Sequence, residues 1–167
     1  MTGSQTTKLA FDASPLRLAI LAARFNGALV DQLVEGATRA WREHGGRDNR
    51  LVVRRVPGAF ELPLAAQKFA ASGDYQAVIA LGCVIRGDTP HFDFVAGECA
   101  RGLMHAGLAT GVPVIFGVLT TETQAQAEER ASLTRMNKGR ESMEAALEMI
   151  GLLEPLGRKR PAKKGRR

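Results

Sequence analysis

Four short runs of aliphatic and β-branched residues alternate along the chain with longer amphipathic stretches. The runs cover residues 16–22, 51–56, 77–85 and 112–119. The third and fourth are apolar nearly throughout, as is typical of strands buried on both faces of a parallel sheet. Pro113 lies at the start of the fourth run, where a strand tolerates a missing N–H. This alternation predicts repeated strand–helix units.

The amphipathic stretches repeat their apolar residues at helical spacing. Two long helices are predicted, one from the series Leu29, Leu33, Ala37 and Trp41 and the other from the series Val95, Cys99, Leu103 and Ala106. Gly45 and Gly46 follow the first series, and Gly107 and Gly111 follow the second. Glycine at these positions favours a helix end.

Three further helices are expected. One covers residues 61–71, with Pro63 in its first turn. Thr121 with Gln124 three residues later resembles a capping box for a helix that runs through Ala131. The last helix has one apolar face, formed by Met143, Ala146, Leu147, Ile150 and Leu153.

These elements predict a three-layer α/β/α sandwich around four core parallel strands, formed by one domain over residues 16–155. Residues 1–15 are expected to be either a flexible arm or an added edge strand, and residues 156–167 a disordered basic tail. The chain has 167 residues, of which 45% are hydrophobic. A chain of this length buries about 70% of its unfolded surface, enough for a core without disulfides or metal.

The net charge of +6 is concentrated at one end of the chain. Seven of the 23 basic residues lie in positions 158–167, which leaves 16 basic against 17 acidic residues in the rest. A nucleic-acid-binding domain would carry its positive charge on the folded surface, so the sequence argues against that class. The tail itself could contact polyanions, or it could be a solvated charge run.

Several other classes of protein are disfavoured by the sequence. Cys83 and Cys99 form no CxxC pair, which predicts reduced thiols in a cytoplasmic protein. The N-terminus lacks a basic segment followed by an apolar run, so no signal peptide is expected. The longest uncharged stretch, residues 102–121, contains four glycines and Pro113 and is not expected to span a membrane.

The sequence carries no metal-binding or nucleotide-binding motif. The three histidines (His44, His91 and His105) are far apart, and no His/Cys/Asp cluster has ligand spacing. There is no Gly-x-Gly-x-x-Gly or Gly-x-x-x-x-Gly-Lys loop. The sequence therefore predicts no metal, and it does not support dinucleotide or nucleoside-triphosphate binding.

Candidate chemistry lies in the segments that follow the predicted strands, because open parallel sheets bind ligands at the carboxyl ends of their strands. These segments read ARFNG at 23–27, PGAFE at 57–61, RGDTPHFD at 86–93 and TTE at 120–122. Exposed Phe25 and Phe60 could stack on a planar ligand. Thr89, where a helix begins, indicates an anion site, and His91 could transfer protons near neutral pH.

Each of these residues also has an ordinary structural explanation. Phe25 and Phe60 could be core or interface residues, and Glu61 could be a favourable carboxylate in the first turn of a helix. Thr89 could be a simple N-cap, and His91 a surface residue. The basic residues Arg130 and Lys138 could be solvated charges.

Several motifs together resemble the 6,7-dimethyl-8-ribityllumazine synthase family. They are RFN at 24–26, VPGAFE at 56–61, LGCVIRGDTPHFD at 81–93, GVPVIFGVLTTE at 111–122, ERA at 129–131 and NKG at 137–139. The resemblance covers about residues 16 to 153, in order and with family spacing. It implies a flavodoxin-like fold and the condensation of 5-amino-6-(D-ribitylamino)uracil with 3,4-dihydroxy-2-butanone 4-phosphate, the penultimate step of riboflavin synthesis.

The resemblance also implies roles for individual residues. The substrate-binding set it implies is Phe25, Ala59, Phe60, Glu61, Cys83, Val84, Ile85, Asp88, Thr89 and Phe116. In this assignment Phe25 stacks on the pyrimidine, while residues 59–61 hold the ribityl chain and residues 83–85 offer backbone groups to the pyrimidine edge. Asp88, through its N–H, and Thr89 bind phosphate.

The catalytic set implied by the resemblance is His91, Arg130 and Lys138. His91 is the proton donor and acceptor, Arg130 binds the phosphate, and Lys138 meets the polar edge of the substrate. In this family Phe116, Arg130 and Lys138 reach the site from the adjacent subunit. No cofactor is needed, because the substrate's own amine is the nucleophile.

The family resemblance implies a homopentamer or a larger assembly, with an icosahedral shell left open, and it makes riboflavin synthase a candidate partner. The alternative is a non-catalytic relative that binds flavin or lumazine or forms a shell. A generic flavodoxin-like nucleotide-binding module would not explain paired Phe25 and Phe60. One departure from the family is the stretch SLTRM at 132–136. Many family members have a glycine-rich run here, so this stretch should be stiffer in the present chain.

Overall fold

A computed structural model of the chain describes residues 11–157. Its centre is a four-stranded parallel sheet in the order β2-β1-β3-β4. The strands are β1 (Leu18–Ala23), β2 (Leu51–Val56), β3 (Ala77–Ile85) and β4 (Val114–Thr121). β2 and β3 have the predicted bounds, while β1 and β4 each begin two residues later than predicted. Pro113 precedes β4 and contributes a carbonyl to the ladder, which accepts from the N–H of Val78 at 2.9 Å.

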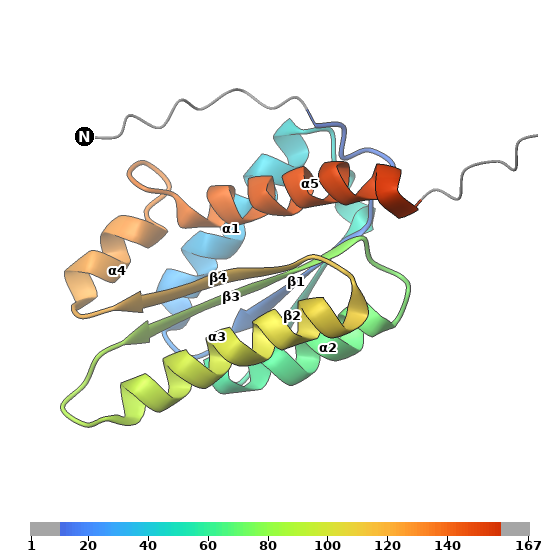
Figure 1. Cartoon of the computed structure of the whole chain (residues 1–167). Coiled ribbons are helices and arrows are strands. Elements are labelled where there is room, and N and C mark those ends of the chain that lie inside the picture. The colour runs from blue at the N-terminus through green and yellow to red at the C-terminus, as the bar shows by residue number, and fades with distance from the viewer. Residues whose placement is uncertain (1–10, 158–167) are drawn as a thin grey trace, which may run out of the picture.

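Helices cover both faces of the sheet, as the sequence predicts for a three-layer sandwich (Figure 1). One face carries α1 (Gly27–Glu43), α4 (Gln124–Ala131) and α5 (Lys138–Gly157), and the other carries α2 (Leu62–Ala71) and α3 (His91–Thr110). Two 3₁₀ turns, η1 (Asp48–Arg50) and η2 (Ala59–Glu61), flank β2. The α/β fold is thus confirmed, with the carboxyl ends of all four strands at the same end of the sheet.

The core has two halves because side chains alternate across the sheet. Ile20, Ile79 and Leu81 pack with α1, α4 and α5, and Leu21 and Val78 pack with α2 and α3. Trp41 is the largest fully buried side chain, and its indole N–H donates to the Arg47 carbonyl at 3.1 Å. Burial on both faces explains why β1 and β3 read as apolar nearly throughout. The same prediction was wrong for β4, an edge strand in which Phe116 and Thr120 are exposed.

The predicted capping box, Thr121 with Gln124, lies two residues before the one in the structure, Thr123 with Gln126. Thr121 is the last residue of β4, where it pairs with Ile85, so it cannot cap a helix. Thr123 caps α4 instead: its hydroxyl accepts from the N–H of Gln126 at 3.2 Å, and the Gln126 side chain accepts from the N–H of Thr123 at 3.3 Å. The error arose because β4 continues two residues beyond the expected end.

Other helix bounds also differ from prediction. Residues 59–61 form η2, so α2 begins at Leu62, with Pro63 in its first turn as predicted. Helix α3 continues through Gly107 to Thr110 and ends at Gly111, whose φ of 69° suits glycine. The second glycine of that pair is therefore the helix stop.

The two ends of the chain are described only in part. Residues 11–17 contain a turn and no strand, and Ala13 is buried with its N–H bonded to the His44 carbonyl at 2.9 Å. Helix α5 extends to Gly157, two residues into the segment predicted to be disordered. The remaining residues of the predicted arm and tail, 1–10 and 158–167, lie outside the described residues. No helix within residues 11–157 is long and apolar enough to cross a membrane.

An ion-pair group joins α1 to α5. The Arg140 guanidinium bonds to Glu43 of α1 and, at 2.7 Å, to Glu144 of its own helix. The hydrogen bond from Arg140 lowers the pKa of Glu43 below its ordinary value of 4.5. A carboxyl whose pKa is lower in the folded state stabilises the fold above its ordinary pKa, and that contribution is lost as the pH falls.

We therefore expect Glu43→Gln to lower the free energy of unfolding at pH 7 by about 1 kcal/mol or less, because the pair is partly solvent-exposed. The difference from the unsubstituted protein should shrink as the pH falls below 4.5. Urea denaturation at fixed protein concentration measures both effects. Glu148→Gln on exposed α5 surface is the control and should show neither. A Glu43→Gln difference that stays constant into acid would contradict this assignment.

Candidate functional site

A pocket of about 700 Å³ lies at the carboxyl ends of β1, β2 and β3. Three loops and the first turns of α3 form its wall. Its lining includes Phe25, Ala59, Phe60, Glu61, Cys83, Val84, Ile85, Thr89 and His91. The fold thus brings together residues that lie up to 70 positions apart in the sequence, from Phe25 to Val95. We refer to this as the strand-end pocket.

Backbone hydrogen bonds connect the loops of the strand-end pocket. Parallel pairing sets Ala23 beside Val56. Beyond this pair, the N–H groups of Arg24 and Phe25 donate to the carbonyls of Val56 and Pro57 at 2.8 and 3.2 Å. Asn26, with φ at 55°, donates from its side-chain amide to the Cys83 carbonyl at 2.8 Å. The three strand ends are therefore connected before any ligand binds.

The aromatic side chains of this pocket are not core residues. Phe25 is 72% exposed and Phe60 is 59% exposed, which excludes the core explanation within the single subunit. Phe92 and Phe94 also line the pocket, although the sequence did not single them out as site residues. The pocket therefore offers several accessible rings to a planar ligand.

The loop from β3 to α3 contributes the polar groups. Gly87, Thr89 and His91 line the pocket, whereas Asp88 is exposed and does not. The N-cap of α3 is Pro90, without a side-chain cap, so the alternative explanation of Thr89 as a simple N-cap is wrong. The Thr89 hydroxyl accepts weakly from the His91 N–H at 3.4 Å. The His91 imidazole makes no hydrogen bond within residues 11–157 and is exposed. It is accessible to a ligand.

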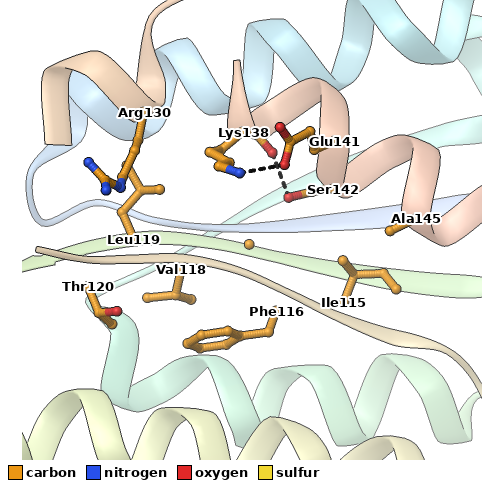
Figure 2. Close-up of a pocket in the computed structure, with 11 residues that line it drawn as sticks. Ile115, Phe116, Val118, Leu119, Thr120, Arg130, Lys138, Glu141, Ser142 and Ala145 are labelled. Atoms are coloured by element: carbon orange, nitrogen blue, oxygen red, sulfur yellow. Dashed lines mark hydrogen bonds and ion pairs between the residues drawn. The ribbon is translucent and has the colours of Figure 1, made fainter. Parts of the chain in front are cut away.

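Phe116, Arg130 and Lys138 line a different pocket of about 380 Å³. It lies along β4, which forms one edge of the sheet, between α4 and α5 (Figure 2). Figure 2 shows Phe116 on the opposite side of β4 from Arg130 and Lys138. This edge pocket shares no lining residue with the strand-end pocket.

The turn that holds Lys138 is built by its two neighbours in sequence. Asn137 adopts a positive φ of 46°, and its side-chain carbonyl accepts from the N–H of Arg140 at 3.1 Å, which satisfies an N–H at the start of α5. Gly139 packs directly on the backbone of Leu33 in α1. In the stretch 132–136, expected to be stiff, the Ser132 carbonyl accepts from the Asn137 N–H at 3.0 Å, which closes the loop.

Glu141 lines the edge pocket, although the sequence did not single it out. Its carboxylate accepts from the Lys138 ammonium at 2.6 Å, and both residues line the edge pocket. The signal was an acidic residue three positions after the lysine, a spacing that brings side chains together on a helix. Arg130 has a looser environment, with one donation to its own helix, at the Gln126 carbonyl, 3.1 Å away.

The charges divide between the two pockets. The titratable side chains that line the strand-end pocket are Glu61, Cys83 and His91, with no lysine or arginine, while the edge pocket holds Arg130 and Lys138. Burial raises the pKa of Cys83 to about 11 and that of Cys99 to about 12, so both are neutral thiols at pH 7. Within residues 11–157, no group of three or more His, Cys, Asp and Glu side chains could hold a metal ion.

Comparison with known proteins agrees with the motifs. Residues 15–154 match the family model of 6,7-dimethyl-8-ribityllumazine synthase. A curated relative, the 6,7-dimethyl-8-ribityllumazine synthase of Nitratidesulfovibrio vulgaris (strain DSM 19637 / Miyazaki F), is 53% identical over 146 residues. The aligned region covers 87% of this chain and 94% of the relative.

The packing of Gly139 yields a test of how Lys138 is held. A methyl group at this position would overlap the Leu33 carbonyl, a backbone atom that cannot move aside cheaply. We expect Gly139→Ala to lower the free energy of unfolding by about 1–3 kcal/mol. In the matched control Gly151→Ala, on the same helix, the new methyl would only touch Phe11 at 3.8 Å. Thermal unfolding compares the two, and equal midpoints would refute the close packing.

Proposed function

The chain belongs to the 6,7-dimethyl-8-ribityllumazine synthase family, and we propose that it catalyses the reaction for which the family is named. The amine of 5-amino-6-(D-ribitylamino)uracil condenses with the ketone of 3,4-dihydroxy-2-butanone 4-phosphate, which forms an imine and releases water. Elimination of phosphate follows and generates a new carbonyl group. Attack of the ribityl-bearing amine on that carbonyl, with loss of a second water, closes the second ring. The enzyme is a transferase of riboflavin biosynthesis.

The strand-end pocket is proposed to hold the pyrimidine substrate. Phe25 stacks on its ring, the backbone of Cys83, Val84 and Ile85 bonds to its edge, and Glu61 with Ala59 and Phe60 holds the ribityl chain. The exposure of both phenylalanines and the convergence of these loops at one pocket support this assignment. The pKa of Cys83, raised by burial, agrees with a contact through its backbone rather than its thiol.

The observation that carries the proposal is the separation of the two pockets. A phosphate at Thr89 meets N–H groups at the start of α3, with the N–H of Asp88 beside it, but the strand-end pocket holds no lysine or arginine. Arg130 and Lys138 lie in the edge pocket of the same subunit. A second copy that sets its edge pocket against the strand-end pocket would complete the site with Phe116, Arg130 and Lys138.

The chemistry then requires three contributions from the protein. Holding two reactants in contact can lower the barrier by about 7–11 kcal/mol. His91 transfers protons as the imine forms and the ring closes, typically worth about 10² to 10⁴ in rate. Arg130 binds the phosphate and stabilises its negative charge as it leaves, while Lys138 meets the polar edge of the substrate.

The surface around β4 supports assembly into a homopentamer or a larger particle. An apolar groove of about 560 Å³ runs between α3, β4 and α5, and it includes the exposed Met104 and Leu108. Phe116, 45% exposed, lines both this groove and the edge pocket. Apolar surface of this kind marks contacts with other protein surfaces.

A non-catalytic relative is less well supported, because His91 and Arg130 both line pockets. A cytoplasmic location is part of the proposal and agrees with two free, buried cysteines. Riboflavin synthase is the candidate protein partner. Contact of the basic tail with polyanions remains a separate hypothesis about residues outside the described part of the chain.

Turnover of the two substrates by the purified protein tests the proposal directly, and its absence would refute it. We expect His91→Ala to reduce kcat by about 10² to 10⁴ without altering assembly.

Arg130→Ala should raise KM for the phosphate substrate about tenfold to a hundredfold, as expected for one lost hydrogen bond to a charged group. KM for the pyrimidine should change little. Arg39→Ala, which removes an exposed pair with Glu35 on α1, is the control and should leave both constants unchanged. If Arg130→Ala altered only the pyrimidine dependence, the phosphate assignment would be wrong.

A further inference from the structure

Arg86 lies at the point where β3 ends and the loop to α3 begins. Its backbone N–H donates to the Thr121 carbonyl at 2.8 Å and so extends the β3–β4 ladder by one bond. Its side chain does not line either pocket. The sequence analysis assigned it no role beyond its place in a family motif.

The guanidinium of Arg86 contacts three side chains at once. It donates to both carboxylate oxygens of Asp93, at 3.3 and 3.1 Å, and to Glu122 at 2.7 Å. Its Cζ lies 4.3 Å from the centre of the Phe92 ring. We call these four residues the Arg86 cluster. A two-pronged guanidinium–carboxylate contact fixes orientation as well as distance, and stacking on an aromatic ring adds to it.

The Arg86 cluster surrounds the turn that carries His91. Phe92 and Asp93 follow His91 directly in the first turn of α3. That turn has no side-chain cap, and Asp93, whose carboxylate could otherwise turn back to free N–H groups, is bound by Arg86. Glu122 lies between the end of β4 and the cap of α4. Arg86 therefore fastens the start of α3 to the end of β4.

The charges of the Arg86 cluster distinguish this role from phosphate binding. Two carboxylates already surround the single guanidinium, so its positive charge is neutralised within the cluster. These bonds raise the pKa of Arg86 above its ordinary value, so the group stays charged throughout the accessible pH range. An anion would have to displace both carboxylates to use it.

We propose that Arg86 is a positioning residue, which sets the geometry of His91 and of the phosphate-binding loop 87–90 by fixing both ends of that loop. The effect of Arg86 on catalysis rests on the proposed function, whereas its effect on the position of loop 87–90 does not. With Arg86 at one end and Asp93 at the other, the loop has little freedom to move Thr89 or the imidazole away from a bound substrate.

Hydrogen exchange of the intact assembled protein tests the structural part without substrate. Arg86→Met should raise exchange at the amides of residues 87–93 about tenfold or more, and Asp93→Asn should raise it in the same segment by less. Arg39→Met is the matched control, since it removes an exposed arginine–glutamate pair elsewhere. Unchanged exchange in both Arg86→Met and Asp93→Asn would overturn the proposal. If one of these two variants misfolds, the other still tests it.

Steady-state kinetics test the catalytic part. Arg86→Met should lower kcat and raise KM for the phosphate substrate. KM for the pyrimidine should change little, because Phe25 and Phe60 lie on other loops and residues 83–85 are held by their pairing with β4. If Arg86 acts through His91, adding Arg86→Met to His91→Ala should change kcat by no more than about twofold. If the double variant instead shows a loss of kcat equal to the product of the two single losses, Arg86 acts independently of His91 and the assignment is overturned.

Arg86→Lys separates geometry from charge. An ammonium keeps the charge but cannot form the same fork with Asp93 and Glu122, so it should not restore kcat. Full activity of Arg86→Lys would overturn the proposal. An inactive wild-type protein whose Arg86→Met variant still shows faster exchange would refute the proposed function while leaving the structural part of the proposal standing. If the wild-type protein is active but Arg86→Met shows the same exchange and kinetics as Arg39→Met, the proposed function stands and the role of Arg86 is refuted.

Discussion

Parallel pairing of β1 with both β2 and β3 is the constraint on which the site depends. It brings the carboxyl ends of three strands to the same end of the sheet. The segments around residues 25, 60 and 85 therefore meet without any contact between their side chains being required. The same sheet order leaves β4 at the outside, with one neighbour rather than two. One end of the sheet therefore forms a pocket, and one edge of the sheet presents a second pocket to whatever lies beside it.

Much of the fold could be predicted because strand burial leaves a strong pattern. β2 and β3 were predicted at their observed bounds, since their apolar runs are bounded by charged or glycine-containing segments. The end of β4 was harder to predict, because Thr120 and Thr121 are polar and still pair with β3. That error also displaced the predicted capping box from Thr123 to Thr121, which shows how one strand end determines the interpretation of the next helix.

The site was predictable only in part, and for a physical reason. Residues that follow parallel strands must gather at the same end of the sheet. The segments that form the strand-end pocket could therefore be predicted from the positions of the strands in the sequence. Nothing in the spacing of Arg130 or Lys138 indicated where they would lie, and their assignment to an adjacent subunit came from family resemblance alone. Glu141 was missed as a pocket-lining residue although its spacing from Lys138 on α5 could have indicated it. Arg86 was missed because its partners, Asp93 and Glu122, lie on other elements.

The proposed division of the site between copies of one chain would explain why Arg130 and Lys138 lie apart from the strand-end pocket. The measurement that tests this most directly is complementation between two impaired variants, assayed at a phosphate-substrate concentration well below its KM, where Arg130→Ala also turns over slowly. When His91→Ala and Arg130→Ala subunits are unfolded together and reassembled in equal amounts, a quarter of the composite sites receive both native residues. The mixture should then recover about a quarter of wild-type activity, as expected for a heterologous interface. A mixture that assembles normally but is no more active than its two parents would contradict a shared site.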